Sequence, residues 1–97
     1  MRKSVLINGK KILDKISLYT YLHEQFNFAY PIGNNLDGLW DVLSHNQSLK
    51  RITIIHSSVL KNNLNEYAIS FLELLSSLQE KRNIELIIYE GKRNETN

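Results

Sequence analysis

Three short runs of apolar residues along the chain indicate β-strands, at residues 4–7, 50–55 and 84–89. The second run is rich in β-branched side chains, which fit a pleated sheet. In the first run the apolar residues are contiguous rather than alternating with polar ones. That pattern is typical of a strand covered on both faces, as in a parallel sheet. We therefore expect a sheet whose first strand is buried on both sides.

Between these runs, apolar residues recur at helical spacing. The pattern predicts a helix over about residues 17–26, capped by the hydroxyl of Ser17, and a longer one over about residues 66–81. A brief helix is expected after the second strand, capped within His56-Ser57-Ser58 and ending near residues 61–63. The residues expected on the buried faces of the two main helices are Leu18, Tyr19, Leu22, Phe26, Tyr67, Phe71, Leu74, Leu75 and Leu78. Strands separated by helical segments pair in parallel, because each return requires a crossover. The fold class is therefore predicted to be α/β, a small three-stranded parallel sheet packed with about four helices.

Residues 33–44 predict a further short helix with one apolar face. Asn34 or Asn35 suits the N-cap position, because a short side-chain amide oxygen can accept a hydrogen bond from the first turn. The apolar stripe consists of Leu36, Leu39, Trp40 and Leu43. Asp37, Asp41 and Ser44 fall together on the neighbouring strip. The helix therefore has an acidic band beside the face that packs inward.

The two aspartates differ in their relation to the helix dipole. Asp37 lies in the first turn, where a negative charge is favourable. Asp41 lies towards the negative end, four residues from Asp37, so two like charges share one face at a cost of about 0.2–0.5 kcal/mol. No lysine or arginine occurs between Lys15 and Lys50 to relieve this repulsion. A charge placed where local rules disfavour it is a candidate for binding; the alternatives are a solvated aspartate or one paired with a distant lysine.

The length and composition of the chain predict a single small domain. The chain has 97 residues and no cysteine, so we expect a single domain over residues 1–91 and a disordered polar tail over residues 92–97. No stretch resembles a signal peptide or a membrane-spanning segment, so we expect no membrane association and a cytoplasmic location. The formal net charge is +2. Residues 16–49 nevertheless carry three acidic residues and no lysine or arginine, so the middle of the chain is acidic between basic ends.

Other chemistry is scarce. Asp41 and His45 at i, i+4 could share a metal ion, but two ligands do not make a site. Ser57 and Ser58 beside His56 could suggest a nucleophile, yet there is no glycine elbow and no orienting acid. The four glycines are scattered and form no phosphate loop. The sequence therefore gives no case for an enzyme, a metal or a cofactor.

The run GNNLDGLWDVL at residues 33–43 resembles the signature of the barstar family, intracellular inhibitors of barnase-type bacterial ribonucleases. Ile7-Asn8-Gly9, the helix after it and the closing apolar strand match the family in order and spacing, so the resemblance covers about residues 4–90. It implies the barstar fold and the inhibition of an extracellular ribonuclease through an acidic helix. The residues implied to contact the partner are Asn35, Asp37, Gly38, Trp40, Asp41, Ser44 and Tyr30.

The chain also departs from the family pattern. Pro31 and Ile32 stand where relatives commonly have two tyrosines, with Tyr30 as a displaced aromatic contact, and His45 replaces what is often a glycine. Family members also place an acidic residue on the last helix at the position of Ser76. Glu73 or Glu80 could compensate for that loss. The family protein is acidic overall, whereas this chain is not, so long-range steering towards a basic nuclease should be weaker.

Three hypotheses follow. The first is inhibition of a ribonuclease, with Asp41 as the central anchor and Asp37 beside it, both mimicking RNA phosphates. The second is a module of the same fold that binds another basic protein. The third is a nucleic-acid binder that uses Lys10, Lys11, Lys15, Lys50 and Arg51. The third is disfavoured because these residues are not interleaved with exposed aromatics and the acidic helix would repel phosphate.

Overall fold

The computed structural model describes residues 3–28 and 32–92. Its elements are β1 (Lys3–Asn8), a 3-10 turn η1 (Gly9–Lys11), α1 (Lys15–Phe26), α2 (Leu36–Ser44), β2 (Leu49–Ile55), α3 (Ser57–Leu64), α4 (Glu66–Arg82) and β3 (Glu85–Ile88). All three strands are parallel, in the spatial order β1-β2-β3. This arrangement confirms the predicted fold class of a three-stranded parallel sheet with four α-helices. Tyr30, Pro31 and residues 93–97 of the tail expected at 92–97 lie outside the described residues.

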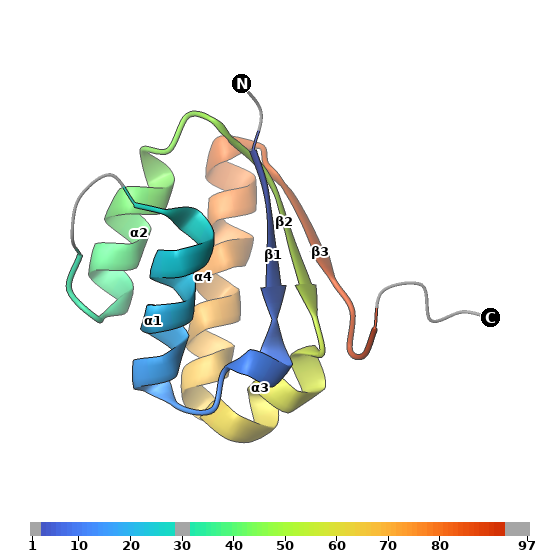
Figure 1. Cartoon of the computed structure of the whole chain (residues 1–97). Helices are drawn as coiled ribbons and strands as arrows, with labels where there is room; N and C mark the ends of the chain where they lie inside the picture. The colour runs from blue at the N-terminus through green and yellow to red at the C-terminus, as the bar shows by residue number, and fades with distance from the viewer. Residues whose placement is uncertain (1–2, 29–31, 93–97) are drawn as a thin grey trace.

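The helices and the sheet form two layers. In Figure 1, α1, α2 and α4 run side by side on one face of the sheet, opposite in direction to the strands, and α3 lies at the end where the strands finish. The core fills the space between the layers with side chains from every α-helix and from β1 and β2; among its fully buried members are Ile7, Leu22, Leu39, Ile54, Leu60 and Phe71. The face of α1 predicted from the sequence, Leu18, Tyr19, Leu22 and Phe26, is entirely buried.

Within residues 3–28 and 32–92 no helix packs on the other face of the sheet, and the expectation that β1 is buried on both sides is wrong. Burial alternates along β1, with Val5 and Ile7 in the core and Leu6 39% exposed. A contiguous apolar run therefore did not indicate two covered faces here, because all three large helices pack on the same side of the sheet. The uncovered face also carries Arg51 of β2, which binds Glu85 of β3 through a 2.8 Å hydrogen bond between Nε and Oε1.

Two of the predicted helix caps are also wrong. The N-cap of α1 is Asp14, whose Oδ1 accepts a 2.8 Å hydrogen bond from the backbone N–H of Ser17. The hydroxyl of Ser17 completes a capping box by accepting from the N–H of Asp14. No side chain caps α3. Instead the N–H groups of its N-cap residue His56 and of its first two residues donate to the backbone carbonyls of residues 89–91, beyond the end of β3.

Candidate functional site

The candidate site is built on α2, whose start follows directly from the sequence. Asn35 has an extended backbone, and its Oδ1 accepts a 2.7 Å hydrogen bond from the N–H of Gly38. Of the two predicted candidates, Asn35 is therefore the N-cap. Leu39, Val42 and Leu43 are buried, while Leu36 and Trp40 are partly buried against the core. This packing fixes which side of α2 is turned towards solvent.

Asp37 and Asp41 are both exposed on α2, as the helical spacing predicts. Ser44, expected on the same exposed strip, is only 9% exposed. Its hydroxyl donates to the backbone carbonyl of Asp41 at 3.2 Å, which holds the side chain against the helix. The acidic band is thus formed by the two aspartates, and Ser44 supports the backbone beneath Asp41.

A groove of about 340 Å³ lies between α2 and α4. Trp40, Leu36 and Leu74 provide its apolar surface, and Asp37 of α2 and Glu73 of α4 contribute carboxylates. The small side chains of Ser70 and Ser77 line the rest. The groove therefore combines an aromatic ring with carboxylates from two helices, an arrangement suited to a cationic side chain with an apolar stem.

Glu73 and Glu80, the two acidic residues that could compensate for Ser76, lie at different places on α4. Glu73 lines the groove together with Asp37 and Trp40, whereas Glu80 lines a different depression beside β3, with Glu85 and Leu86. Sequence reasoning could not choose between the two because the packing of α2 on α4 is not encoded in either segment alone. A usable signal was the seven-residue spacing of Ser70 and Ser77, which marks a shallow helix face with Glu73 on it.

The end of α2 is stabilised by positively charged or polar donors. Arg82 of α4 donates from Nη1 to the carbonyl of Ser44, and His45 Nδ1 lies 2.7 Å from the carbonyl oxygen of Asp41. Cations are favourable at this end of a helix. His45 Nδ1 also lies 3.7 Å from Asp41 Oδ1, with both side chains exposed. His45 is therefore a neighbour of the Asp41 carboxylate, of a residue type that the count of lysines and arginines did not include.

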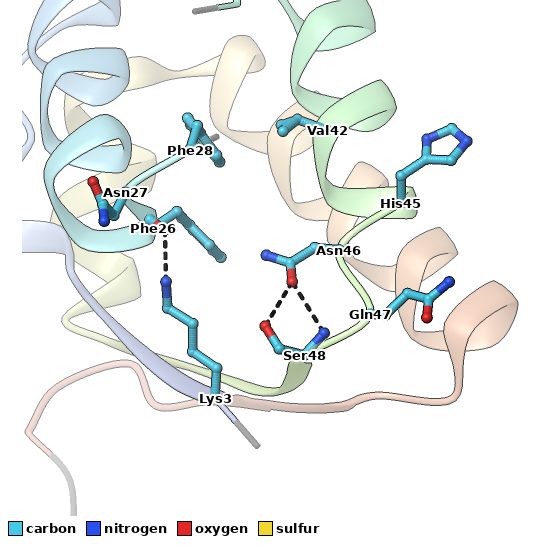
Figure 2. Close-up of a pocket in the computed structure, with 9 residues that line it drawn as sticks. All are labelled: Lys3, Phe26, Asn27, Phe28, Val42, His45, Asn46, Gln47 and Ser48. Carbon is cyan, nitrogen blue, oxygen red and sulfur yellow. Dashed lines mark hydrogen bonds between the residues drawn. The ribbon is translucent and has the colours of Figure 1, made fainter. Parts of the chain in front are cut away.

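A second pocket, of about 450 Å³, lies between the end of α1 and the segment that follows α2 (Figure 2). Its polar groups largely bind one another. Lys3 Nζ donates to the carbonyl of Phe26 at 2.6 Å, and Asn46 Oδ1 accepts from the N–H and hydroxyl of Ser48. These bonds tie β1 to the end of α1 and shape the turn into β2. We therefore assign this pocket a packing role.

The residues of the nucleic-acid hypothesis do not form one surface. Lys10 and Lys11 lie in η1 after the end of β1, and Lys15 opens α1, whereas Lys50 and Arg51 lie near the start of β2. Because β1 and β2 are parallel, these groups lie at opposite ends of the sheet (Figure 1). Arg51 is moreover paired with Glu85. These five residues therefore form no continuous basic path for a phosphate backbone.

Other candidate chemistry finds no support in the described part of the chain. Within residues 3–28 and 32–92 there is no group of three potential metal ligands among histidine, aspartate and glutamate side chains. Ser57 is completely buried, and the Ser58 hydroxyl donates to the carbonyl of Glu90 at 3.0 Å, so neither is placed as a nucleophile. Among the described helices, none is long and apolar enough to cross a bilayer.

Comparison with known proteins gives one finding on family. A family model described as Barstar (barnase inhibitor) matches residues 2–90. A search of curated proteins found no match. The matched segment spans every helix and strand described above.

Proposed function

The chain belongs to the barstar family of barnase inhibitors, and we propose that it inhibits a barnase-type ribonuclease by covering the enzyme's cationic active site with α2 and the neighbouring groove. The observation that carries this proposal is the meeting of Asp37, Glu73 and Trp40 in one groove between two helices. A ribonuclease must bind phosphates with arginine, lysine and histidine, so its active site is complementary to exposed carboxylates.

In this proposal Asp37 and Glu73 accept hydrogen bonds from one cationic side chain of the nuclease, with its stem packed on Trp40. An arginine fits best, because its planar guanidinium can bind a carboxylate through two parallel bonds and stack on an aromatic ring. Asp41 lies one turn further along α2 and is the central anchor for the phosphate-binding residues of the nuclease. The carboxylates thereby occupy the positions of RNA phosphates.

The remaining predicted contacts keep their roles as part of the proposal. Asn35 and Gly38 lie at the start of α2, where the absence of a side chain on Gly38 permits close approach of a partner backbone. Ser44 acts mainly by supporting the backbone at Asp41, given its burial. Tyr30 belongs to the segment outside the described residues. Such an inhibitor would act in the cytoplasm of the cell that makes the nuclease.

The same groove would also accept a cationic side chain from a basic protein that is not a nuclease. The observation that favours this alternative is Ser76, which stands where the family carries an acidic residue on the last helix. The two functions are distinguished by one outcome. Only a ribonuclease inhibitor stops RNA cleavage when it binds its partner.

The experiment is a titration of a barnase-type ribonuclease, with RNA cleavage as the readout, by the native protein and by Asp41→Ala. We expect inhibition to be complete at one inhibitor per nuclease and to weaken at least a hundredfold in Asp41→Ala. Glu24→Ala, which removes an exposed acid on α1, is the matched control and should inhibit like the native protein. Absence of inhibition by native protein with an intact circular dichroism spectrum would reject the ribonuclease target and leave the alternative.

A further inference from the structure

His45 stands beside Asp41 at a position where the family often has glycine. It follows α2 directly, and its side chain is 74% exposed beside the 63% exposed side chain of Asp41. Figure 2 shows the ring turned away from the pocket between α1 and α2, towards solvent. Its position is nevertheless fixed, because Nδ1 lies 2.7 Å from the carbonyl oxygen of Asp41.

This contact determines which ring nitrogen carries the proton in the neutral form. A carbonyl oxygen can only accept a hydrogen bond, so Nδ1 must be the donor. In a neutral imidazole the other nitrogen, Nε2, is then an acceptor. His45 therefore presents a hydrogen-bond acceptor to solvent one turn after the carboxylate of Asp41, and a cationic partner can use both.

We propose that His45 is a further partner-binding residue, and that its protonation lowers the affinity of this surface for a cationic partner. This inference rests on the proposed function, in that the partner is a basic protein. Protonation of the ring changes Nε2 from a hydrogen-bond acceptor to a donor and makes the ring positive. The protonated ring repels the partner's cations and competes with them for Asp41.

Among the described residues, two cations lie on elements near His45. Arg82 of α4 is committed to the carbonyl of Ser44, and Lys3 of β1, which lines the pocket that His45 borders, is committed to the carbonyl of Phe26. The pH dependence proposed here is therefore assigned to His45, the histidine at this end of α2.

The test compares dissociation constants for a barnase-type ribonuclease at pH 8.0 and 5.5, measured by calorimetry with native protein and His45→Gln. The nuclease's own titration affects both proteins equally and cancels in the comparison. We expect the loss of affinity on acidification to be about two- to fivefold larger for the native protein, which corresponds to an exposed charge interaction. His56→Asn is the control, because asparagine tolerates the left-handed backbone found at residue 56 (φ 55°). Equal pH dependence in native protein and His45→Gln would overturn the proposal.

A second measurement needs no nuclease. In the free protein at pH 8, the nitrogen-15 spectrum of the His45 ring should show the proton on Nδ1, and a proton on Nε2 would overturn the proposal. If native protein inhibits no ribonuclease at either pH, the proposed function fails, and a blocked hexaarginine peptide becomes the probe. Its binding to α2, followed by amide chemical shifts, should weaken on acidification in native protein by more than in His45→Gln; an equal response in the two proteins would reject the role of His45.

Discussion

The hydroxyl oxygens of Tyr19 and Tyr67 lie 2.6 Å apart and join α1 to α4. Tyr19 is completely buried, and the two rings meet edge to face with centroids 6.5 Å apart. Lys15 Nζ lies 5.0 Å from the centre of the Tyr67 ring, on the outer side of this pair. Because α4 also forms one wall of the acidic groove, the contact links the first helix to the element that positions Glu73.

Replacing Tyr19 with phenylalanine should lower the free energy of unfolding by about 1 kcal/mol, the usual net contribution of a hydrogen bond. The change keeps the ring and removes only the hydroxyl, so the fold should persist. Urea unfolding at pH 7 measures the difference. Tyr21→Phe is a useful comparison, because the Tyr21 hydroxyl binds the N–H of Asn8 at 2.9 Å in a less buried setting.

The same pair predicts a loss of stability at alkaline pH. Burial, followed by the hydrogen bond and charge interaction with Tyr67, raises the pKa of Tyr19 well above its ordinary value of about 10. The folded protein therefore keeps Tyr19 protonated where the unfolded chain would ionise it. Its contribution to stability is present below pH 10 and declines as the pH rises further. The free energy of unfolding, measured from pH 9 to 11, should decline less for Tyr19→Phe than for the native protein.

Much of the fold could be predicted from local patterns, because short apolar runs and helical spacing report burial within a single element. The predicted strand at residues 50–55 became β2 at Leu49–Ile55, and the helix predicted at residues 66–81 became α4 at Glu66–Arg82. Exposure of Leu6 could not be predicted, since it depends on which side of the sheet every helix packs. The capping of α3 by residues 89–91 was hidden for a similar reason, because its partners are more than thirty residues away.

The candidate site, like the fold, could be predicted from the sequence only in part. The exposure of Asp37 and Asp41 and the N-cap role of Asn35 follow from residues within one helix. The positions of Glu73 and Arg82 relative to α2 follow only from the packing of two helices far apart in sequence. His45 could have been weighed as a cation beside Asp41 from its i, i+4 spacing alone, and sequence reasoning considered that pair only as metal ligands.

Glu73→Gln should weaken ribonuclease inhibition by about tenfold, because it removes one charged acceptor, worth about 1.5 kcal/mol, while leaving the side-chain shape unchanged. Glu80→Gln is its matched control on the same helix, since Glu80 lines a different depression, and we expect a change of less than about twofold. Inhibition constants of the two variants, measured side by side, provide the comparison. A larger loss in Glu80→Gln would place the partner on the β3 side of α4.

Gly9→Ala should be strongly destabilising, by more than about 2 kcal/mol, or prevent folding. Gly9 is buried, and a methyl group there would lie 2.2 Å from the backbone carbonyl oxygen of His56. This contact is with backbone, so it cannot be relieved by a change of side-chain rotamer.

Gly38→Ala is the contrasting substitution. Its methyl group would meet the carbonyl oxygen of Gly33 at 3.3 Å and Asn35 Oδ1 at 3.4 Å, a tight fit that small shifts can relieve. Alanine also favours the helix by up to about 1 kcal/mol. We therefore expect the free energy of unfolding of Gly38→Ala, measured by thermal denaturation, to stay within about 1 kcal/mol of the native value. A loss in Gly9→Ala of less than about 1 kcal/mol would contradict the close contact between residue 9 and the His56 carbonyl.

Shortening the chain tests where the domain ends. The carbonyls of Tyr89, Glu90 and Gly91 accept hydrogen bonds of 3.1, 3.3 and 2.8 Å from the first N–H groups of α3. A chain ending at residue 91 keeps all three acceptors, and its carboxylate lies near the positive end of the helix, so stability should stay within about 0.5 kcal/mol of the full chain. A chain ending at residue 88 leaves those N–H groups without acceptors and should lose about 2–4 kcal/mol. Urea unfolding of both proteins measures these values, and equal stability would mean that water replaces the three carbonyls at no cost.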